Sequence, residues 1–147
     1  MTNLKYEKHF FHTPLIQGTD VKYRIVMQGS KYDFGGLFQN YWLRWNCITQ
    51  PISMAEPHTH QFDEIFHFFG ADPMDISDFQ AVVELTIGEE FEVHTITEPA
   101  IVYIPKGLVH APINFKIINR PIIFMNVANA PEYTETRWTG SRKEVTS

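Results

Sequence analysis

The stretch that decides the fold of this chain is PHTHQFDEIFHFFG, residues 57–70. His58 and His60 are separated by one residue, and Glu64 follows four residues after His60. Because successive side chains of a β-strand point to opposite faces, the two histidines share one face, and Glu64 joins them if the strand persists or resumes in phase. Neighbours on one face are about 7 Å apart at the backbone, so the two rings can converge on one ion.

The runs on either side of this stretch are short, apolar and rich in residues that favour strands. Runs 81–87 and 90–97 alternate mostly with a period of two, and the Gly-Glu-Glu between them predicts a tight hairpin turn. Nine prolines and eight glycines punctuate the chain, and no long helical period appears. Residues 70–79 are the one segment expected to form a helical turn or a long loop. This pattern predicts an all-β sandwich or barrel.

A second stretch, PAIVYIPKGLVHAPIN at residues 99–114, supplies a further histidine, His110, after a Pro-Lys-Gly turn. If strand 100–104 lies across the barrel from strand 58–66, His110 completes a set with His58, His60 and Glu64. Three neutral imidazoles and one carboxylate suit a divalent first-row metal. A barrel interior has no other reason to hold these polar groups together, because unpaired buried charge is costly. The sequence therefore predicts a metal site at these four residues.

The composition limits the class of protein. The chain has 147 residues, 44% of them apolar and 20% charged, which are values typical of one globular domain. Its formal net charge of −5 and the lack of a basic block argue against nucleic acid as a main partner. No run approaches the ~18 apolar residues of a membrane helix, and no secretory segment opens the chain, so we expect a cytoplasmic protein. Cys47, the single cysteine, excludes an intrachain disulfide.

Together, the two stretches resemble the two motifs of the cupin superfamily. The matching residues are His58, His60, Glu64 and Gly70 in the first motif, and Pro105, Gly107, His110 and Asn114 in the second. The resemblance implies a double-stranded β-helix, or jelly-roll barrel, with a metal at its centre, commonly Fe, Mn, Ni, Zn or Cu. We expect one cupin domain over residues 1–147, with its core at about 35–130 and with residues 1–20 and the tail 131–147 peripheral.

The predicted metal centre also indicates a class of function. A divalent metal with three neutral ligands and one carboxylate favours anionic oxygen ligands. We therefore expect a metalloenzyme that acts on a small oxygen-rich organic acid, enol or phenol. The resemblance implies oxygenase, isomerase, lyase or decarboxylase chemistry, of which a dioxygenase-like activity is the leading interpretation. The alternative is a small-molecule binding or sensor module without turnover, because the sequence offers no distinct general base beyond the ligands.

Several residues are candidates for the wall of a substrate pocket. Tyr103, just before the Pro-Lys-Gly turn, is the candidate catalytic residue, as a hydrogen-bond donor or acid to a bound substrate; the alternative is a packed aromatic ring. Arg44 could pair with a substrate carboxylate or form an outward salt bridge. Phe66 and Phe68 share the parity of the metal ligands, and Met125 lies on the last predicted strand.

The strand after the first motif also bears on assembly. Ile65 and Phe69 have the outward parity, yet the inward side of the same strand is apolar too. A strand that is apolar on both faces is buried on both. We therefore expect a homodimer that covers an outer sheet face; the alternative is that residues 1–20 fold back over it. His67 has the outward parity as well, so we do not expect it to be a ligand.

Overall fold

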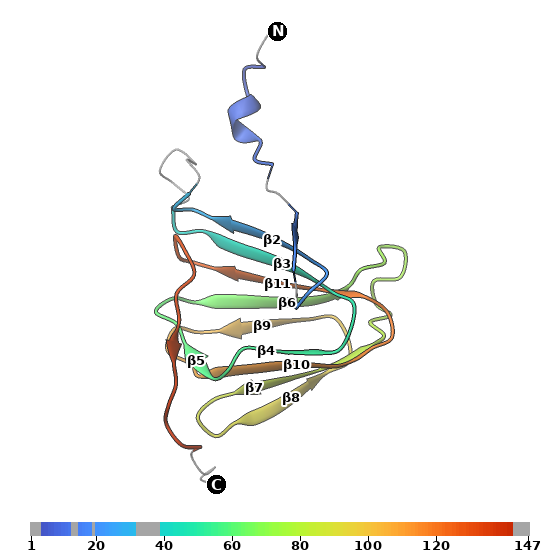
Figure 1. Cartoon of the computed structure of the whole chain (residues 1–147), viewed down its shortest axis with the longest axis vertical. Helices are drawn as coiled ribbons and strands as arrows, with labels where there is room; N and C mark the ends of the chain where they lie inside the picture. Colours follow the sequence, from blue (N-terminus) through green and yellow to red (C-terminus); the bar gives the residue numbers. More distant parts are fainter. Residues whose placement is uncertain (1–3, 13–14, 19, 32–38, 143–147) are drawn as a thin grey trace.

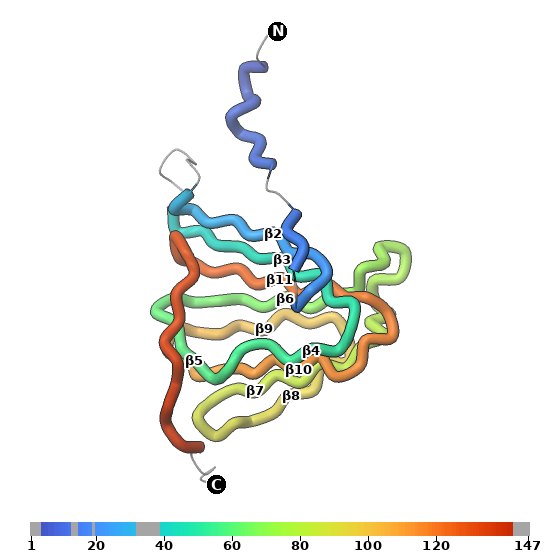
Figure 2. The backbone as a smooth tube through the Cα atoms, viewed as in Figure 1, coloured from blue at the N-terminus to red at the C-terminus, as the bar shows by residue number. Residues whose placement is uncertain are grey.

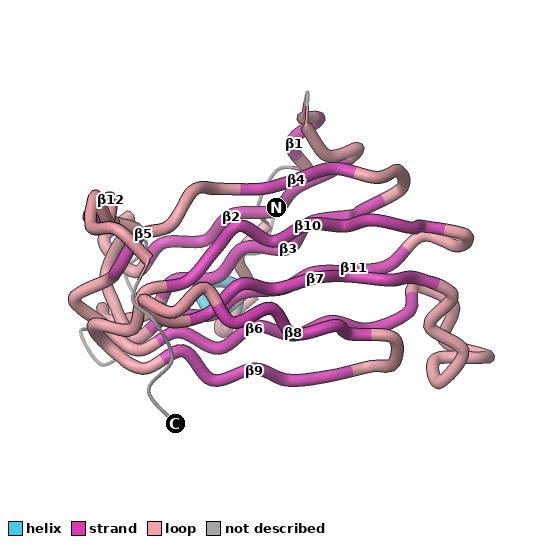
Figure 3. Tube along the Cα trace, turned by 90° about the horizontal axis from the view of Figure 1, so that it is seen from below, coloured by secondary structure: helices cyan, strands magenta, loops and turns pink. Residues whose placement is uncertain are grey.

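The computed structural model describes residues 4–12, 15–18, 20–31 and 39–142. In these residues two antiparallel six-stranded sheets pack face to face as a jelly roll, as Figures 1 and 3 show. The all-β prediction is thereby confirmed. The only helical element described is the short 3-10 helix η1 (Glu7–His9). No helix among the described residues has the length and apolar character needed to span a membrane.

The chain crosses between the two sheets several times. The first sheet has the order β1 (Ile16–Gln17), β2 (Tyr23–Gln28), β3 (Trp42–Ile48), β11 (Ile122–Ala128), β6 (Glu64–Gly70) and β9 (Ala100–Ile104). The second has the order β12 (Thr136–Arg137), β5 (His58–Thr59), β10 (His110–Ile118), β7 (Ala81–Ile87) and β8 (Glu92–Ile96), and β4 (Ile52–Met54) also pairs with β10. Strands distant in sequence therefore lie side by side, which brings the two motifs together.

The core lies between the inner faces of the two sheets. Along β6 and β11 every second residue is buried, as expected for strands with one face against a core. Phe68 of β6 stacks on Phe124 of β11 with ring centroids 4.9 Å apart, and Phe115 of β10 contacts Phe124 from the other sheet. Burying each ring contributes about 1.5–3 kcal/mol. These aromatic side chains pack the two sheets against each other beside the buried polar residues His58, His60, Glu64 and His110.

The predicted hairpin and loop are also present. Alternate residues of β7 are buried, and the turn to β8 places Gly88 at φ 83°, a conformation that side chains with a Cβ rarely adopt. Between β6 and β7, residues 71–80 form a loop of turns with no regular helix. At the other end of the chain, residues 4–12 extend away from the barrel (Figure 2). Our alternative to a homodimer was that residues 1–20 fold back over an outer sheet face. Residues 4–12 do not do so.

Candidate metal centre

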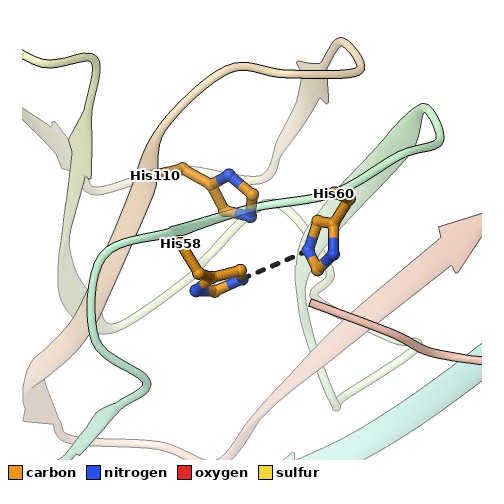
Figure 4. A group of neighbouring side chains, drawn as sticks. All are labelled: His58, His60 and His110. Carbon is orange, nitrogen blue, oxygen red and sulfur yellow. Dashed lines mark hydrogen bonds between the residues drawn. The ribbon is translucent and has the colours of Figure 1, made fainter. Parts of the chain in front are cut away.

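Three histidines meet where β5 lies beside the start of β10 (Figure 4). His58 opens β5, His60 directly follows this strand, and His110 opens β10. His58 and His110 are direct register partners in the antiparallel pair β5–β10. All three are buried, each with 4% or less of its surface exposed. Strand pairing thus joins the two sequence stretches at their histidines.

His110 faces the interior because of an irregularity in β10. Its register with β7 shifts between His110 and Ile113, and Ala111 adopts a positive φ of 85°. Without this β-bulge, His110 would lie on the face opposite to the buried Ile113 and Phe115, because their positions differ by an odd number of residues. The bulge therefore turns the imidazole inward.

Glu64 completes the group from the other sheet. Its Oε2 lies 3.1 Å from His60 Nε2 and 3.5 Å from His110 Nε2. His58 Nε2 and His60 Nε2 are 3.1 Å apart. Donors about 2.1 Å from a shared ion are separated by about 3.0–3.4 Å at angles between 90° and 109°. The separations from His60 Nε2 to His58 Nε2 and to Glu64 Oε2 lie in this range, and the separation from Glu64 to His110 lies just above it. The three histidines each offer a nitrogen within 4.8 Å of the other two. These distances are compatible with donors around one shared ion.

The outer nitrogen of each ring is held by the backbone. The Nδ1 atoms of His58, His60 and His110 lie 2.6, 2.7 and 2.9 Å from the carbonyl oxygens of Glu56, Thr134 and Leu108. A carbonyl oxygen only accepts hydrogen bonds, so each Nδ1 carries the proton and donates it. In the neutral rings Nε2 then presents a lone pair to the centre, which is the tautomer that a metal-binding histidine needs.

The inward-facing atoms have few partners within the protein. His110 Nε2 and Glu64 Oε2 are buried without a hydrogen-bond partner, although buried polar atoms normally have one. When all three rings are neutral, the short contact between His58 Nε2 and His60 Nε2 brings two lone pairs together, which is unfavourable. A cation at the centre would remove both problems. The residues present therefore fit a divalent metal.

The ionisation of these groups in the metal-free protein follows from the same contacts. Burial, and then the neighbouring His110, lowers the pKa of His58 to about 4. Burial also disfavours protonated His60, but the hydrogen bond and charge of Glu64 outweigh it, so the pKa of His60 is raised. For Glu64, burial is outweighed by the adjacent rings of His110 and His60 and by the hydrogen bond from Asn126, which lower its pKa to about 2. Glu64 is thus an anion at neutral pH and can act as a ligand without losing a proton.

A small cavity lies against the donor atoms. Its volume is about 30 Å³, enough for about two water-sized groups. Its wall includes His58, Glu64, His110, Arg44, Phe66, Phe124, Asn126 and Tyr133. The wall is therefore apolar on the core side and polar beside the histidines. Phe66 lines this cavity, as its parity led us to expect, and Phe68 is buried in the core. Of the two alternatives for Arg44, an outward salt bridge is not found, because Arg44 lines the cavity.

Comparison with solved structures identifies the architecture. The structure aligns with an RmlC-like cupin from Shewanella frigidimarina over 82% of this chain and 85% of that one, with a TM-score of 0.51 and 9% identity. It aligns with a polyketide cyclase from Streptomyces resistomycificus over 96% and 87%, with a TM-score of 0.57 and 11% identity. This chain has the cupin fold. No family model and no curated protein sequence matches it.

A longer chain with a similar fold gives a further match. The chain aligns with an oxalate decarboxylase variant from Bacillus subtilis over 95% of its own length, with a TM-score of 0.56 and 17% identity. It covers 33% of that longer chain. The similarity at these identities concerns the fold alone, so the chemistry of this cupin has to be argued from its own residues.

The order of the strands corrects our expectation that one strand spans residues 58–66 and faces strand 100–104 across the barrel. The strand that carries His58 ends at Thr59, and the chain crosses to the other sheet before β6 begins at Glu64. Strand β9 lies beside β6 in the same sheet, not across the barrel from it. Glu64 nevertheless faces the histidines, because it is the first inward residue of β6. The pairing of β10 with β5 is what places His110.

Tyr103 does not line the cavity, which corrects our expectation that it belongs to the wall of a substrate pocket and acts on the substrate there. In β9 the buried residue is Ile104, which pairs with Glu64, and the alternation of the strand turns Tyr103 outward. Its side chain is 58% exposed, and its hydroxyl donates to Asp63. Met125 also faces outward, whereas Phe124 and Asn126 of the same strand face inward. His67 lies on the outer face as expected.

The tail 131–147 is not peripheral where the structure describes it, which corrects our expectation for this segment. Tyr133 lines the cavity, and its hydroxyl oxygen lies 3.4 Å from His58 Nε2. The carbonyl of Thr134 holds His60, and β12 pairs with β5. The run Tyr-Thr-Glu-Thr-Arg shows no period of two, so the sequence offered no signal for this role.

Asn126 is a second residue that the sequence analysis missed. Its side-chain Nδ2 donates to Glu64 Oε1 at 2.9 Å, and both residues are buried. In the register of the first sheet, Asn126 lies between Arg44 of β3 and Phe66 of β6. The alternation of apolar residues in this run shows that Asn126 faces inward. The sequence alone does not show that it lies beside Glu64, because that depends on how β11 pairs with β6.

Proposed function

We propose that this chain is a metal-dependent cupin that binds one divalent transition metal. The ligands are His58, His60, Glu64 and His110. The observation that carries the proposal is the convergence of three lone-pair nitrogens and one carboxylate oxygen, with buried atoms that lack partners. Nitrogen and oxygen donors of this kind bind Fe, Mn, Ni, Zn or Cu, and the donor set alone does not select among them.

The substrate class follows from charge and space. A bound divalent metal would supply Lewis-acid chemistry, or redox chemistry where the ion is redox-active. Its charge, together with that of Arg44, exceeds the single negative charge of Glu64, so the cavity favours an anion. We infer an enzyme for a small oxygen-rich acid, enol or phenol, with dioxygenase-like, isomerase or lyase chemistry. Oxalate decarboxylase and a polyketide cyclase share the fold, which supports an enzymatic role.

A binding or sensor function without turnover is the second candidate, and one observation favours it. Apart from the four proposed ligands, the ionisable groups that line the cavity are Arg44 and Tyr133. Burial, and then the charges of Glu135 and Glu64, raises the pKa of Tyr133, so its hydroxyl keeps its proton at neutral pH. Arg44 is a permanent cation. Neither group can accept a proton as a general base.

The metal content of the purified protein tests the proposal. Elemental analysis should find about one transition metal per chain, and His58→Ala and His60→Ala should reduce it at least tenfold. His94→Ala is the matched control, because His94 is an exposed histidine of β8 whose ring contacts Glu92 and does not line the cavity. Metal retained by both site variants at the wild-type level would contradict the proposed ligands.

Two measurements separate catalysis from binding. Protein reconstituted anaerobically with Fe(II) should consume dioxygen with at least one member of a panel of phenols, diketones and small acids. Saturable binding of a small acid, with no product by mass spectrometry after long incubation, would favour the sensor function instead. The absence of both turnover and binding in metal-loaded protein would refute both functions.

We also propose that the chain forms a homodimer through the outer face of its first sheet. Trp45, Ile65 and Ile101 of neighbouring strands are exposed on this face. An open apolar hollow of about 560 Å³ lies on the same face, lined in part by Phe69 and Ile76. Exposed apolar surface of this kind is typical of interaction sites. Sedimentation should give a dimer, and Ile101→Lys should give a monomer; a wild-type monomer at high concentration would refute the proposal.

A further inference from the structure

Arg44 is a cationic side chain that lines the cavity beside the proposed metal centre. It lies on the inner face of β3, opposite Asn126 of β11, and lines the same cavity as His58 and Glu64. Asn126 is the direct register partner of Arg44 on β3 and of Phe66 on β6, and Glu64 lies two residues from Phe66 along β6. The side chain of Asn126 donates its hydrogen bond to Glu64 and not to Arg44. Arg44 therefore lies beside the proposed metal centre and forms no ion pair with Glu64.

The guanidinium of Arg44 has no anionic partner in the described part of the chain. The other arginines of these residues contact a carboxylate or a backbone carbonyl. They are Arg24 with Asp20, Arg120 with Asp75 and Asp78, Arg137 with Glu56, and Arg142 with the carbonyl of Glu90. Arg44 instead lies over the rings of Trp42 and Tyr133, at 5.3 and 5.5 Å, and its Nε is buried without a hydrogen-bond partner. A buried cation without a counter-charge is costly.

Tyr133 supplies a neutral donor next to this cation. Its ring packs on Trp42 with centroids 4.9 Å apart, and its hydroxyl points toward the histidines, 3.4 Å from His58 Nε2. Because the hydroxyl keeps its proton, it can donate a hydrogen bond to an oxygen atom in the cavity. A guanidinium and a phenol hydroxyl at one cavity are the groups that recognise a carboxylate.

We propose that Arg44 and Tyr133 form a carboxylate-binding subsite beside the metal centre. The guanidinium pairs with the carboxylate of the ligand, and the Tyr133 hydroxyl donates a hydrogen bond to it. The cavity of about 30 Å³ has room for about two water-sized groups, which matches the two oxygen atoms of one carboxylate. This inference rests on the proposed function, since the metal adds the positive charge that completes the attraction. It narrows the substrate from small oxygen-rich molecules to small carboxylic acids.

Calorimetric titration of Zn(II)-loaded protein with acetate and with oxalate tests the subsite. The wild type should bind both, and should not bind acetamide, which has a similar shape but no charge. Arg44→Met should weaken acetate binding at least tenfold, and Tyr133→Phe about three- to tenfold, while elemental analysis finds the metal retained. Arg120→Gln is the matched control, because Arg120 lies outside the cavity beside Asp75 and Asp78, and it should leave acetate binding unchanged.

Thermal unfolding separates a binding role of Arg44 from a structural one. Replacing an unpaired buried cation with an apolar chain of similar length should leave Tm unchanged or raise it. A lower Tm of Arg44→Met with wild-type acetate affinity would overturn the inference, and so would equal binding of acetamide and acetate. If Arg44→Met does not fold, Arg44→Lys serves instead, and its acetate affinity should fall at least threefold because Lys lacks the planar fork.

The same titration distinguishes failure of the subsite from failure of the metal proposal. Wild-type protein that holds zinc but does not bind acetate or oxalate would refute the subsite alone. Protein that holds no zinc would refute the proposed metal centre, and the metal-free protein would then be titrated with acetate. Acetate binding by the metal-free wild type that is lost in Arg44→Met would support the subsite. Failure of the metal-free wild type to bind acetate would overturn it.

Discussion

The side-chain amide of Asn126 donates a hydrogen bond from Nδ2 to Oε1 of Glu64 at 2.9 Å, inside the barrel. Because Oε1 is engaged, Oε2 is left to face His60 and His110. The contact joins β11 to the first residue of β6, so it is set by the register of the first sheet. Asn126 is thus positioned to orient the carboxylate that we propose as a metal ligand.

Asn126→Ala should weaken metal binding about 10- to 100-fold, because the carboxylate loses the donor that orients it. The stoichiometry should remain one metal per chain when the metal is in excess. Competition with a chromophoric chelator measures the affinity. Asn129→Ala, an exposed position just beyond β11, is the control and should bind metal as the wild type does. Equal affinities of the wild type and Asn126→Ala would contradict an orienting role.

The metal-free protein should lose stability as pH falls from 6.5 to 4.5 because of His58. The folded-state pKa of about 4 lies below the ordinary value of 6.5, so only the unfolded chain takes up a proton at His58 in this window. Glu64, with a pKa of about 2, is ionised in the folded state throughout this window, and the raised pKa of His60 favours its protonated form.

Urea unfolding at several pH values measures this effect. The free energy of unfolding should fall by about 1–3 kcal/mol more in the wild type than in His58→Gln across the window. Chelator is present throughout, so that bound metal does not contribute. Parallel pH profiles for the two proteins would show that the ring of His58 titrates in the folded state as it does in the unfolded chain.

Phe124→Ala should destabilise the protein by about 3–5 kcal/mol. The ring is 1% exposed, stacks on Phe68 and lines the cavity, so its removal leaves a void that the two sheets cannot close. Chemical denaturation measures the change. Phe10→Ala, at an exposed position in the N-terminal segment, should change stability by less than about 0.5 kcal/mol. A loss at Phe124 no larger than that at Phe10 would place the core elsewhere.

Deletion of residues 133–147 should weaken metal binding at least tenfold while the barrel still folds. The deletion removes the carbonyl of Thr134, which holds His60, and the short strand β12, but no residue of the main core cluster. Far-UV circular dichroism should show retained β-structure, and chelator competition should show the loss of affinity. A shorter deletion of residues 140–147 keeps both contacts and is the control. Wild-type affinity after the longer deletion would exclude a role for the tail in the centre.

The sequence predicted the fold class and the four residues that meet in the centre, but only His58 and His60 for a clear physical reason. The period-two spacing of His58 and His60 is a local property of an extended chain, and both rings do face inward. The alternation of Phe66 and Phe68 likewise follows from the strand alone. His110 was found through its motif and not through parity, because the β-bulge after it reverses the face that simple alternation would assign.

The rest of the site depends on pairing between distant segments, which a single sequence does not specify. Asn126 and Arg44 become neighbours only through the register of β3 and β11. Tyr133 reaches the cavity because its segment runs along β5, a contact that no periodic pattern announces. Tyr103 was assigned to the wrong face because the inward phase of its strand is set by the pairing of Ile104 with Glu64.

The carbonyl of Thr134 that secures His60 belongs to a residue 74 positions further along the chain. During synthesis, His58 and His60 emerge from the ribosome well before this residue does. A nascent chain therefore presents an incomplete set of imidazoles, one of them with no fixed tautomer. Under the proposed metal-binding function, the complete site would form only after residue 134 has left the ribosome, so the finished barrel and not the nascent chain would take up the ion.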